Sequence, residues 1–307
     1  EQSKFKRAHI RKINAAIDYI EDNIYDELNL TTISNVSGFS PFHFHRIFKA
    51  HMGETINRFL QRIRLEKAAT QLLHNHEKSI TDIAFDCGFS GSAAFARLFK
   101  EKYGMSASEW QKKMLRKNGE SLRKNCKSER NIGKENRLTF DYYNDSNTWR
   151  LTMKEKNSTT FEVKEMAAMT VAYVRHIGPY KGDSELFEQL YSKVTTWAGA
   201  RDLLKFPETK FLTAYHDDPG ITDEQQLRIS VGLTVPSDVK TDGEIGKMEI
   251  PKRKYGIGHF ELKADEFESA WTRIYRDWLP QSGYQPDEGA CLEICLNDPK
   301  EHPEHKH

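Results

Sequence analysis

The sequence has few cysteines and no long apolar run. Its 307 residues include only four cysteines, Cys87, Cys126, Cys291 and Cys295, and no two of them form a CxxC pair. This usage argues against a disulfide framework and indicates reduced thiols. No apolar stretch approaches the roughly 18 residues that a membrane helix requires, and the polar, basic N-terminal end shows no signal peptide. We therefore expect a cytoplasmic protein.

Signatures of catalysis and of cofactor binding are also missing. We recognise no Ser/His/Asp arrangement and no phosphate-binding glycine loop. His216, His302, His305 and His307 suggest a metal site, but the last three stand in a short polar tail among Glu and Lys residues. We expect no metal, no cofactor and no enzymatic activity.

Charge is divided unequally along the chain. Residues 1–137 hold 25 Lys and Arg against 16 Asp and Glu, a net charge of +9, whereas residues 138–307 hold 21 against 29, a net charge of −8. A basic half suits a polyanionic partner such as nucleic acid. A solvated basic surface would have the same composition, so the charge alone leaves both interpretations open.

One motif occurs twice in the basic half. Gly38-Phe39-Ser40 returns as Gly88-Phe89-Ser90, and the helical stretch from Phe44 to Lys49 returns as Phe95 to Lys100, each copy closed by a glycine. Both copies predict a tight turn that leads into a short amphipathic helix. Two copies about fifty residues apart indicate a duplicated structural unit.

The helix of the first copy carries side chains suited to reading DNA. Pro41 fits its first position, where a missing N–H costs nothing. Phe42, His45, Arg46 and Lys49 fall away from the apolar face. An aromatic ring, hydrogen-bonding groups and a guanidinium that can grip guanine bidentately are the groups that contact base edges in the major groove.

Apolar periodicity predicts further helices around these two copies, over 8–24, 30–36, 54–74 and 106–117. We expect Thr31 or Thr32 to cap the second of them, and Ser79 with Asp82 to form a capping box before another short helix. The helix over 54–74 is about 30 Å long, close to one turn of B-DNA at about 34 Å. The two short helices would then enter successive major grooves.

The acidic half has a different pattern of predicted secondary structure. Residues 117–137 are polar and basic, as in a tether, and 138–156 suggest one or two strands joined by a turn at 144–147. Beyond 159 we infer two strand–helix–strand units packed side by side, about eighty residues apart. Their elements are predicted at 169–176, 183–199, a strand ending at Tyr215, 255–260, 264–279 and 291–296, with another strand at 229–235.

The N-terminal repeat resembles the DNA-binding domain of the AraC family of transcriptional regulators. The residues that carry the resemblance are Gly88-Phe89-Ser90, Phe95-x-Arg97-x-Phe99-Lys100, and Gly104 followed by Ser-x-Ser-x-Trp. It covers about 8–115 and implies two helix-turn-helix subdomains joined by a long helix.

By position in this motif, Phe42, His45 and Arg46 should read bases from the first helix. Ser92, Ala93, Ala96 and Arg97 hold the matching positions on the second, with Lys49 and Lys100 behind them on the two helices. Because two alanines offer only methyl contacts, we expect the first helix to carry more of the specificity. Ser92 can also serve only as a helix cap.

The C-terminal repeat is similar to the GyrI-like, or multidrug-regulator effector-binding, domain over about 159–307. The carriers are Gly178-Pro179-Tyr180, Tyr215-x-Asp217-Asp218-Pro219, Trp278-Leu279-Pro280-x-Ser282-Gly283-Tyr284, and Glu293 before Asn297-Asp298-Pro299. The resemblance implies a groove that binds lipophilic, often cationic small molecules, with Glu293 as the buried glutamate that faces them. The family usually has a further strand after the position of His307.

Aromatic residues in this half are candidate walls of the effector site. They are Tyr180, Trp197, Tyr215, Trp271, Tyr275 and Trp278. Aromatic faces attract lipophilic cations, but each of these residues can equally be part of an ordinary core. A buried carboxylate needs a donor or a cation, and a tyrosine hydroxyl would satisfy Glu293 as well as a ligand would.

The sequence thus predicts a multidomain fold. An all-α DNA-binding domain of two helix-turn-helix subdomains spans 1–117, a linker spans 118–158, and an α+β GyrI-like domain of two repeated strand–helix–strand units spans 159–307. We expect a sequence-specific transcriptional regulator whose partners are double-stranded DNA, a small-molecule effector and RNA polymerase. Two alternatives stay open: the GyrI-like domain could hydrolyse small molecules with Glu293 and Tyr215, or it could be a protein-interaction module.

Overall fold

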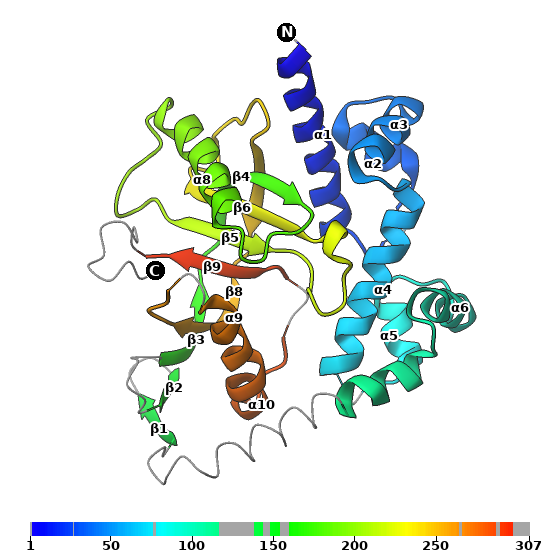
Figure 1. Cartoon of the computed structure of the whole chain (residues 1–307), viewed down its shortest axis with the longest axis vertical. Helices are drawn as coiled ribbons and strands as arrows, with labels where there is room; N and C mark the ends of the chain where they lie inside the picture. Colours follow the sequence, from blue (N-terminus) through cyan, green and yellow to red (C-terminus); the bar gives the residue numbers. More distant parts are fainter. Residues whose placement is uncertain are drawn as a thin grey trace.

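The computed structural model describes residues 2–26, 28–75, 78–116, 138–143, 148–153, 160–263, 266–286 and 289–296. The helices before residue 117 form one half of the molecule and all strands lie in the other half (Figure 1). The stretch expected as a tether, 117–137, lies outside the described residues, as do Cys126, the Asn-Asp-Pro motif at 297–299 and the histidines of the C-terminal tail.

The helical half contains every helix that the periodicity predicts. Its elements are α1 (Gln2–Asp22), α2 (Leu30–Ser37), α3 (Pro41–Met52), α4 (Ile56–His74), α5 (Ile80–Asp86), α6 (Ser92–Tyr103) and a helix over 107–116. The start of α1 precedes the predicted one because the apolar periodicity begins only at Ile10, whereas the helix continues into a polar first turn.

The cap predicted for α2 was wrong. Asn29 holds the N-cap position, and its Oδ1 accepts from the backbone N of Thr32 over 2.9 Å. Asparagine is among the best N-cap residues, because its short side chain reaches the free N–H groups of the first turn. Half of the capping box at α5 is confirmed: the backbone N of Asp82 donates to Ser79 Oγ over 3.1 Å, while Asp82 Oδ2 accepts from the Ser79 hydroxyl over 2.6 Å.

The two predicted tight turns share one geometry. Gly38 ends α2 at a φ of 65°, and Gly88 follows α5 at a φ of 76°. In each turn the next residue, Phe39 or Phe89, donates its backbone N–H to a helix carbonyl five residues back, at 3.3 and 3.1 Å. This is the Schellman arrangement, which requires a left-handed residue and so favours glycine. The repeated sequence motif therefore encodes a repeated turn.

Two separate hydrophobic cores lie on either side of α4. The first packs α1 to α3 against the N-terminal part of α4, around Phe44, Phe48 and Phe59. The second packs α5, α6 and the helix over 107–116 against the C-terminal part, around Phe99 and Trp110. Because one continuous helix belongs to both cores, it fixes the distance between the two subdomains.

The strands of the other half form two antiparallel sheets. The order β1-β2-β3-β8 joins β1 (Leu138–Tyr143), β2 (Thr148–Met153), β3 (Thr160–Met166) and β8 (Arg253–His259). The order β7-β4-β6-β5-β9 joins β7 (Gly246–Ile250), β4 (Met169–Ile177), β6 (Arg228–Val235), β5 (Phe211–Tyr215) and β9 (Cys291–Cys295). Of the one or two strands expected within 138–156, both are present as β1 and β2, and β2 pairs with β3. The turn expected at 144–147 lies outside the described residues.

Both strand–helix–strand units are present, but they are interleaved instead of lying side by side. The first is β4, α8 (Ser184–Gly199) and β5; the second is β8, a helical segment and β9. The helical segment consists of α9 (Phe267–Thr272), a π-helical stretch (Arg273–Trp278) and α10 (Leu279–Ser282). Pairing of β8 with β3 and of β9 with β5 divides the second unit between the sheets. An unpaired strand edge exposes N–H and C=O groups, and β9 covers such an edge of β5.

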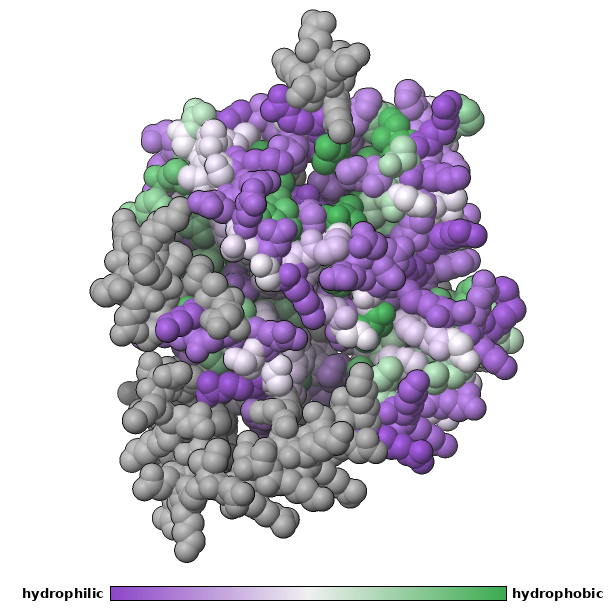
Figure 2. All heavy atoms as spheres, viewed as in Figure 1, coloured by the Kyte–Doolittle hydropathy of each residue, from purple (hydrophilic) through white to green (hydrophobic). Residues whose placement is uncertain are grey.

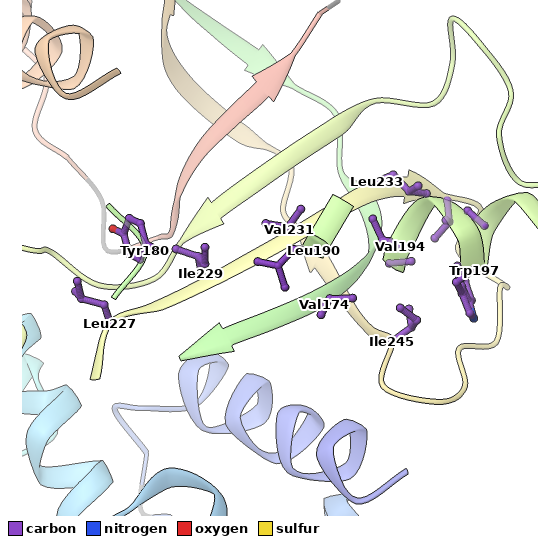
Figure 3. Packing of buried hydrophobic residues seen from close by; sticks show 13 residues of the cluster. Val174, Tyr180, Leu190, Val194, Trp197, Leu227, Ile229, Val231, Leu233 and Ile245 are labelled. Atoms are coloured by element: carbon purple, nitrogen blue, oxygen red, sulfur yellow. The ribbon is translucent and has the colours of Figure 1, made fainter. Parts of the chain in front are cut away.

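The five-stranded sheet is covered on one face by α8. Ala172 and Val174 of β4 and Ile229 and Val231 of β6 belong to this core. Figure 3 shows it, with Tyr180 and Trp197 at its two ends. Since alternate residues of a strand point to opposite faces, the intervening residues of β4 and β6 face the other way, toward α1.

The sheets lie beside α1 and α4, whereas α3 and α6 lie on the side of the helical half away from them (Figure 1). On the face drawn in Figure 2, hydrophobic residues form small separate patches among hydrophilic ones. In the described part of the chain, no helix has both the length and the apolar character that crossing a membrane demands.

Candidate functional site

The outer face of α3 carries exposed side chains at helical spacing. Phe42 is 74 % exposed, and Arg46 and Lys49 are also exposed, four and seven residues further on. The Arg46 guanidinium carbon lies 5.8 Å from the centre of the Phe42 ring. His45 is half-buried beside them. These residues present a ring and two cations to solvent on one side of the helix.

The outer face of α6 is arranged in the same way with smaller side chains. Ala93, Arg97 and Lys100 occupy the positions of Phe42, Arg46 and Lys49, and all three are exposed. The remaining candidates, Ser92 and Ala96, are exposed as well. A depression of about 370 Å³ beside the start of α6 is lined by small side chains that include Ala93, Ala96 and Thr81. Gly91, not Ser92, holds the N-cap position of α6.

Arg64, near the middle of α4, connects the turn that follows α1 with the Gly88 turn that precedes α6. Its Nε donates to Ile24 O over 2.9 Å and its Nη2 to Asp26 O over 2.8 Å, both just after α1. Its Nη1 donates to Gly88 O over 2.7 Å, in the turn before α6. One guanidinium therefore joins both subdomains across the helix that separates them.

A second constellation surrounds Glu293 on β9. Tyr215, at the end of β5, donates its hydroxyl to Glu293 Oε2 over 2.8 Å. The Trp271 side chain lies close enough to Glu293 to lower the pKa of its carboxyl group. The Tyr215 ring lies 5.6 Å from that of Tyr180 and 6.0 Å from that of Trp271, measured between ring centres. Tyr275 packs beside Trp271 at 6.2 Å. We call these five residues the Glu293 cluster.

The electrostatics of the Glu293 cluster leave its carboxyl group short of compensation. Burial raises the pKa of Glu293, and the hydrogen bond from Tyr215 together with the nearby Trp271 side chain opposes that rise without cancelling it. Burial also raises the pKa of Tyr180 to about 12. Burial and the charge of Glu293 raise the pKa of Tyr215. These tyrosines are therefore neutral donors, and within the part of the chain that the structure describes no cationic side chain shifts the pKa of Glu293.

Two thiols and a further tyrosine adjoin the cluster, and the sequence analysis did not single them out. Cys291 and Cys295 stand two residues before and after Glu293 on β9, so the three side chains share one face. Tyr275 Oη lies 2.8 Å from Cys291 Sγ, and Tyr191 Oη lies 3.7 Å from Cys295 Sγ. Burial raises the pKa of both thiols. The period-two alternation of side chains along Cys291–Leu296 is the sequence signal that places the two cysteines on the same face as Glu293.

Two of the aromatic candidates are not brought to this cluster. Trp197 lies toward the C-terminal end of α8, where its Nε1 donates to Asp242 Oδ1 over 2.7 Å. Trp278 stacks on Phe161 of β3, 5.7 Å between ring centres, and packs over Gly256 of β8. Both are core residues of other parts of the domain. The offset of about eighty residues between them reflects the repeat, not a shared site.

The helix that carries Trp271 and Tyr275 is irregular next to the cluster. Residues 273–278 follow α9 as a π-helix. Such stretches are rare and are frequently found at functional sites. Here the irregular turn includes Tyr275, while Trp271 stands in the preceding α-helical turn. No group of three or more His, Cys, Asp or Glu residues suited to a metal ion occurs among the residues described.

Comparison with known families matches both halves. A helix-turn-helix domain model matches residues 33–113, and a model described as a GyrI-like small molecule binding domain matches 159–307. A DNA gyrase inhibitor of Yersinia enterocolitica is 33 % identical over 147 residues, which is 45 % of this chain and 87 % of that protein. The transcriptional activator RhaS of an Enterobacter species is 38 % identical over 98 residues, 32 % of this chain and 35 % of RhaS. The chain is an AraC-type DNA-binding regulator with a GyrI-like small-molecule binding domain.

The two halves of the regulator are similar to different proteins. It spans about a third of the length of the RhaS activators that it matches. Among solved structures, an AraC-type transcriptional regulator from Chromobacterium violaceum is 27 % identical over 33 % of this chain and 88 % of its own, with a TM-score of 0.31. In the present chain, the exposed surface of α3 and α6 is the candidate DNA-binding surface, and the Glu293 cluster is the candidate effector site.

Proposed function

We propose that this regulator reads two successive major grooves with α3 and α6 and that a lipophilic cation bound at the Glu293 cluster controls it. The protein works in the cytoplasm, engages RNA polymerase at its promoters, and acts by binding and not by catalysis. We further propose that the DNA-binding domain ends at 117 and that the GyrI-like domain begins at 159. The observation that carries the effector proposal is a half-buried carboxyl group among aromatic rings, with the neutral Tyr215 hydroxyl as its hydrogen-bond donor.

The dimensions of the helical half support the DNA proposal. The 19 residues of α4 give a spacer of about 28 Å, and each recognition helix stands at one end of it. The candidate contacts are Phe42, His45, Arg46 and Lys49 on α3, and Ser92, Ala93, Ala96, Arg97 and Lys100 on α6. Arg46 and Arg97 are the residues suited to guanine. The depression at Ala93 and Ala96 suits a thymine methyl group.

The chemistry of the cluster supports a cationic effector. A ligand cation beside Glu293 would supply an opposite charge that none of the described residues supplies, and it would lower the pKa of that carboxyl group. Tyr180, Tyr215, Trp271 and Tyr275 offer ring faces, which attract cations electrostatically and bury apolar surface. Neutral phenols adjust their hydroxyls to a ligand more readily than fixed charges would.

Binding of a charge-reversed pair of probes tests the effector class. Tetraphenylphosphonium and tetraphenylborate have almost the same shape and opposite charge. We expect the intact chain to bind the cation and reject the anion, and Glu293→Gln to lose most of the affinity for the cation. Glu208→Gln removes an exposed carboxylate from the same domain and serves as the matched control. Equal binding of both probes, or unchanged binding by Glu293→Gln, would refute the proposal.

Selection from a random pool of DNA duplexes tests the proposed sequence-specific binding by α3 and α6. We expect the intact chain to enrich one asymmetric site with two conserved blocks about one helical turn apart. Binding should weaken steeply between two salt concentrations, because neutralised phosphates release counterions. Enrichment of a single block, or of no sequence at all, would contradict readout by two helices.

A further inference from the structure

Charged side chains connect α1 to the face of the five-stranded sheet opposite α8. Asp18 and Glu21 stand three residues apart on α1 and so lie on one side of it. Arg175 of β4 donates from Nη2 to Asp18 Oδ1 over 2.8 Å, and Tyr173 also donates to Asp18. Arg228 of β6 pairs with Glu21, with 2.5 Å between Nη1 and Oε1. The DNA-binding half and the GyrI-like domain therefore meet through ion pairs.

These ion pairs are buried. The side chains of Arg175 and Arg228 are 1 % and 2 % exposed. Burial alone would raise the pKa of Glu21, but the combined attraction of Arg228 and His216 holds it well below its ordinary value. Removing one partner of a buried ion pair leaves the other charge without compensation. Contact between the two halves thus depends on the carboxylates of α1.

A single segment, 216–228, contacts both helix-turn-helix subdomains. At its end, the Arg228 guanidinium carbon lies 5.4 Å from the centre of the Phe59 ring, in the core of the first subdomain. In its middle, Ile221 packs against the core of the second subdomain. Burial raises the pKa of Tyr103 on α6, and the charges of Glu66 and Asp218 raise it further. The segment therefore bridges the subdomains from the side opposite α3 and α6.

The segment is held in a defined shape. Asp217 accepts from the backbone N of Arg228 over 2.8 Å and from its Nη2 over 2.6 Å, so the two ends of the segment are tied together. Within it, the backbone N of Thr222 donates to Asp218 O over 2.8 Å. A displacement at one end is therefore passed to the other.

The segment begins at the Glu293 cluster. Tyr215 is the last residue of β5, and its hydroxyl bonds to Glu293. The next residue, His216, points to the opposite face of the sheet, with its Nδ1 3.3 Å from Glu21 Oε2. A ligand that takes the carboxyl group of Glu293 would compete with the Tyr215 hydroxyl at the point where β5 leads into the segment.

We propose that segment 216–228 is the element that couples the effector site to DNA binding, docked by the buried ion pairs of Asp18 and Glu21. This inference rests on the proposed binding of an effector at Glu293. While docked, the segment holds the two recognition helices in one relative position. An effector that displaces it and a DNA site that selects that position must change each other's affinity by the same factor.

The test is a coupling measurement on the full chain. DNA affinity for the selected site is measured with and without saturating tetraphenylphosphonium, in the wild type and in Asp18→Asn/Glu21→Gln. We expect a coupling factor of about 5 or more in the wild type and a factor near 1 in the double variant, which still binds each ligand alone. Asp22→Asn removes an exposed carboxylate of the same helix and should keep the wild-type factor. Ile221→Ser breaks the other contact of the segment and should also lower the factor.

The outcomes separate the two proposals. A wild type that binds tetraphenylphosphonium and couples, together with a double variant that couples equally, would overturn the role of the segment and leave the effector proposal standing. A wild type that does not bind tetraphenylphosphonium would overturn the effector proposal and, with it, this coupling route. Small-angle X-ray scattering tests the docking without any ligand: the double variant should have a larger radius of gyration than the wild type and Asp22→Asn. An unchanged radius would overturn docking through these carboxylates.

Discussion

Tyr215 and His216 are neighbours on the chain, yet their side chains serve opposite faces of the five-stranded sheet. The Tyr215 hydroxyl lies 2.8 Å from Glu293 Oε2, and His216 Nδ1 lies 3.3 Å from Glu21 Oε2 of the DNA-binding half. The alternation of a β-strand produces this arrangement at no further structural cost. Two adjacent residues thus connect the candidate effector site with the surface that docks the DNA-binding half.

The first prediction concerns stability and pH. Because burial raises the pKa of Glu293, its carboxyl group binds a proton more tightly in the folded state than in the unfolded one. Its ionisation therefore lowers stability as pH rises from about 4.5 upward. Glu293→Gln should be more stable than the wild type at neutral pH, and the difference should vanish below about pH 4. Thermal unfolding between pH 4 and pH 8 measures this.

The exposed Glu208→Gln gives the baseline for that series, because it removes a carboxylate from the surface of the same domain. A wild type that is more stable than Glu293→Gln at pH 8 would show that the hydrogen bond from Tyr215 outweighs the burial of Glu293.

The second prediction concerns two of the three tryptophans that the sequence placed in the effector site. Trp271 packs against Tyr215 beside Glu293, whereas Trp197 donates to Asp242 near the other end of α8. Trp271→Phe should weaken tetraphenylphosphonium binding by about threefold or more, because the indole face attracts a cation more strongly than a phenyl ring does. Trp197→Phe should change the affinity by less than about twofold and lower the thermal stability instead. Titration calorimetry and thermal unfolding separate the two effects, and equal loss of affinity in both variants would contradict the placement.

Much of the helical half could be predicted from the sequence because its signals are local. The turn at Gly38 and the capping box of Ser79 and Asp82 each depend on residues within a few positions. The cap of α2 was mispredicted because Asn29, Thr31 and Thr32 can all cap a helix, and the choice depends on where the helix packs. Local chemistry therefore allowed three possible caps, and packing of the helix into the core selected Asn29.

The effector site was harder to predict from the sequence, because its residues come from four separate elements. Glu293 and Tyr215 could be identified as candidates, but which aromatic rings join them depends on strand order. The pairing of β9 with β5 brings Cys291 and Cys295 to the site, and the pairing of β8 with β3 takes Trp278 away from it. Sheet order involves contacts between distant residues, which a single sequence does not reveal.

The third prediction concerns Arg64. Its guanidinium donates to three backbone carbonyls, of Ile24, Asp26 and Gly88. Arg64→Ala removes all three bonds and leaves the carbonyls of two turns without their partner, so we expect a loss of about 2–3 kcal/mol in the free energy of unfolding. DNA affinity should fall as well, because the turn before α6 loses its tie to α1. Urea denaturation and DNA titration measure the two effects.

Arg58→Ala is the control for this prediction, because Arg58 is exposed on the same helix and should cost less than about 0.5 kcal/mol. If Arg64→Ala matched Arg58→Ala in stability, the three bonds would contribute nothing beyond what water supplies.

The last prediction concerns the unequal contribution of the two recognition helices. Arg46 stands beside the exposed ring of Phe42, whereas Arg97 stands beside the small side chain of Ala93. Arg46→Ala should relax the base preference in one block of the selected site and weaken binding by about 1–3 kcal/mol, the contribution of a bidentate contact to guanine.

Arg97→Ala should affect only the other block, and by less. Few hydrogen-bonding groups surround Arg97, so that block depends more on methyl contacts and on DNA shape. Lys49→Ala should weaken binding to all sequences alike and reduce the salt slope by about one, as a phosphate contact would. Lys240→Ala removes an exposed cation from the GyrI-like domain and should change neither the preference nor the slope. If Arg97→Ala relaxed its block as strongly as Arg46→Ala relaxes the other, the two helices would read DNA equally, and the alanines of α6 would not limit its specificity.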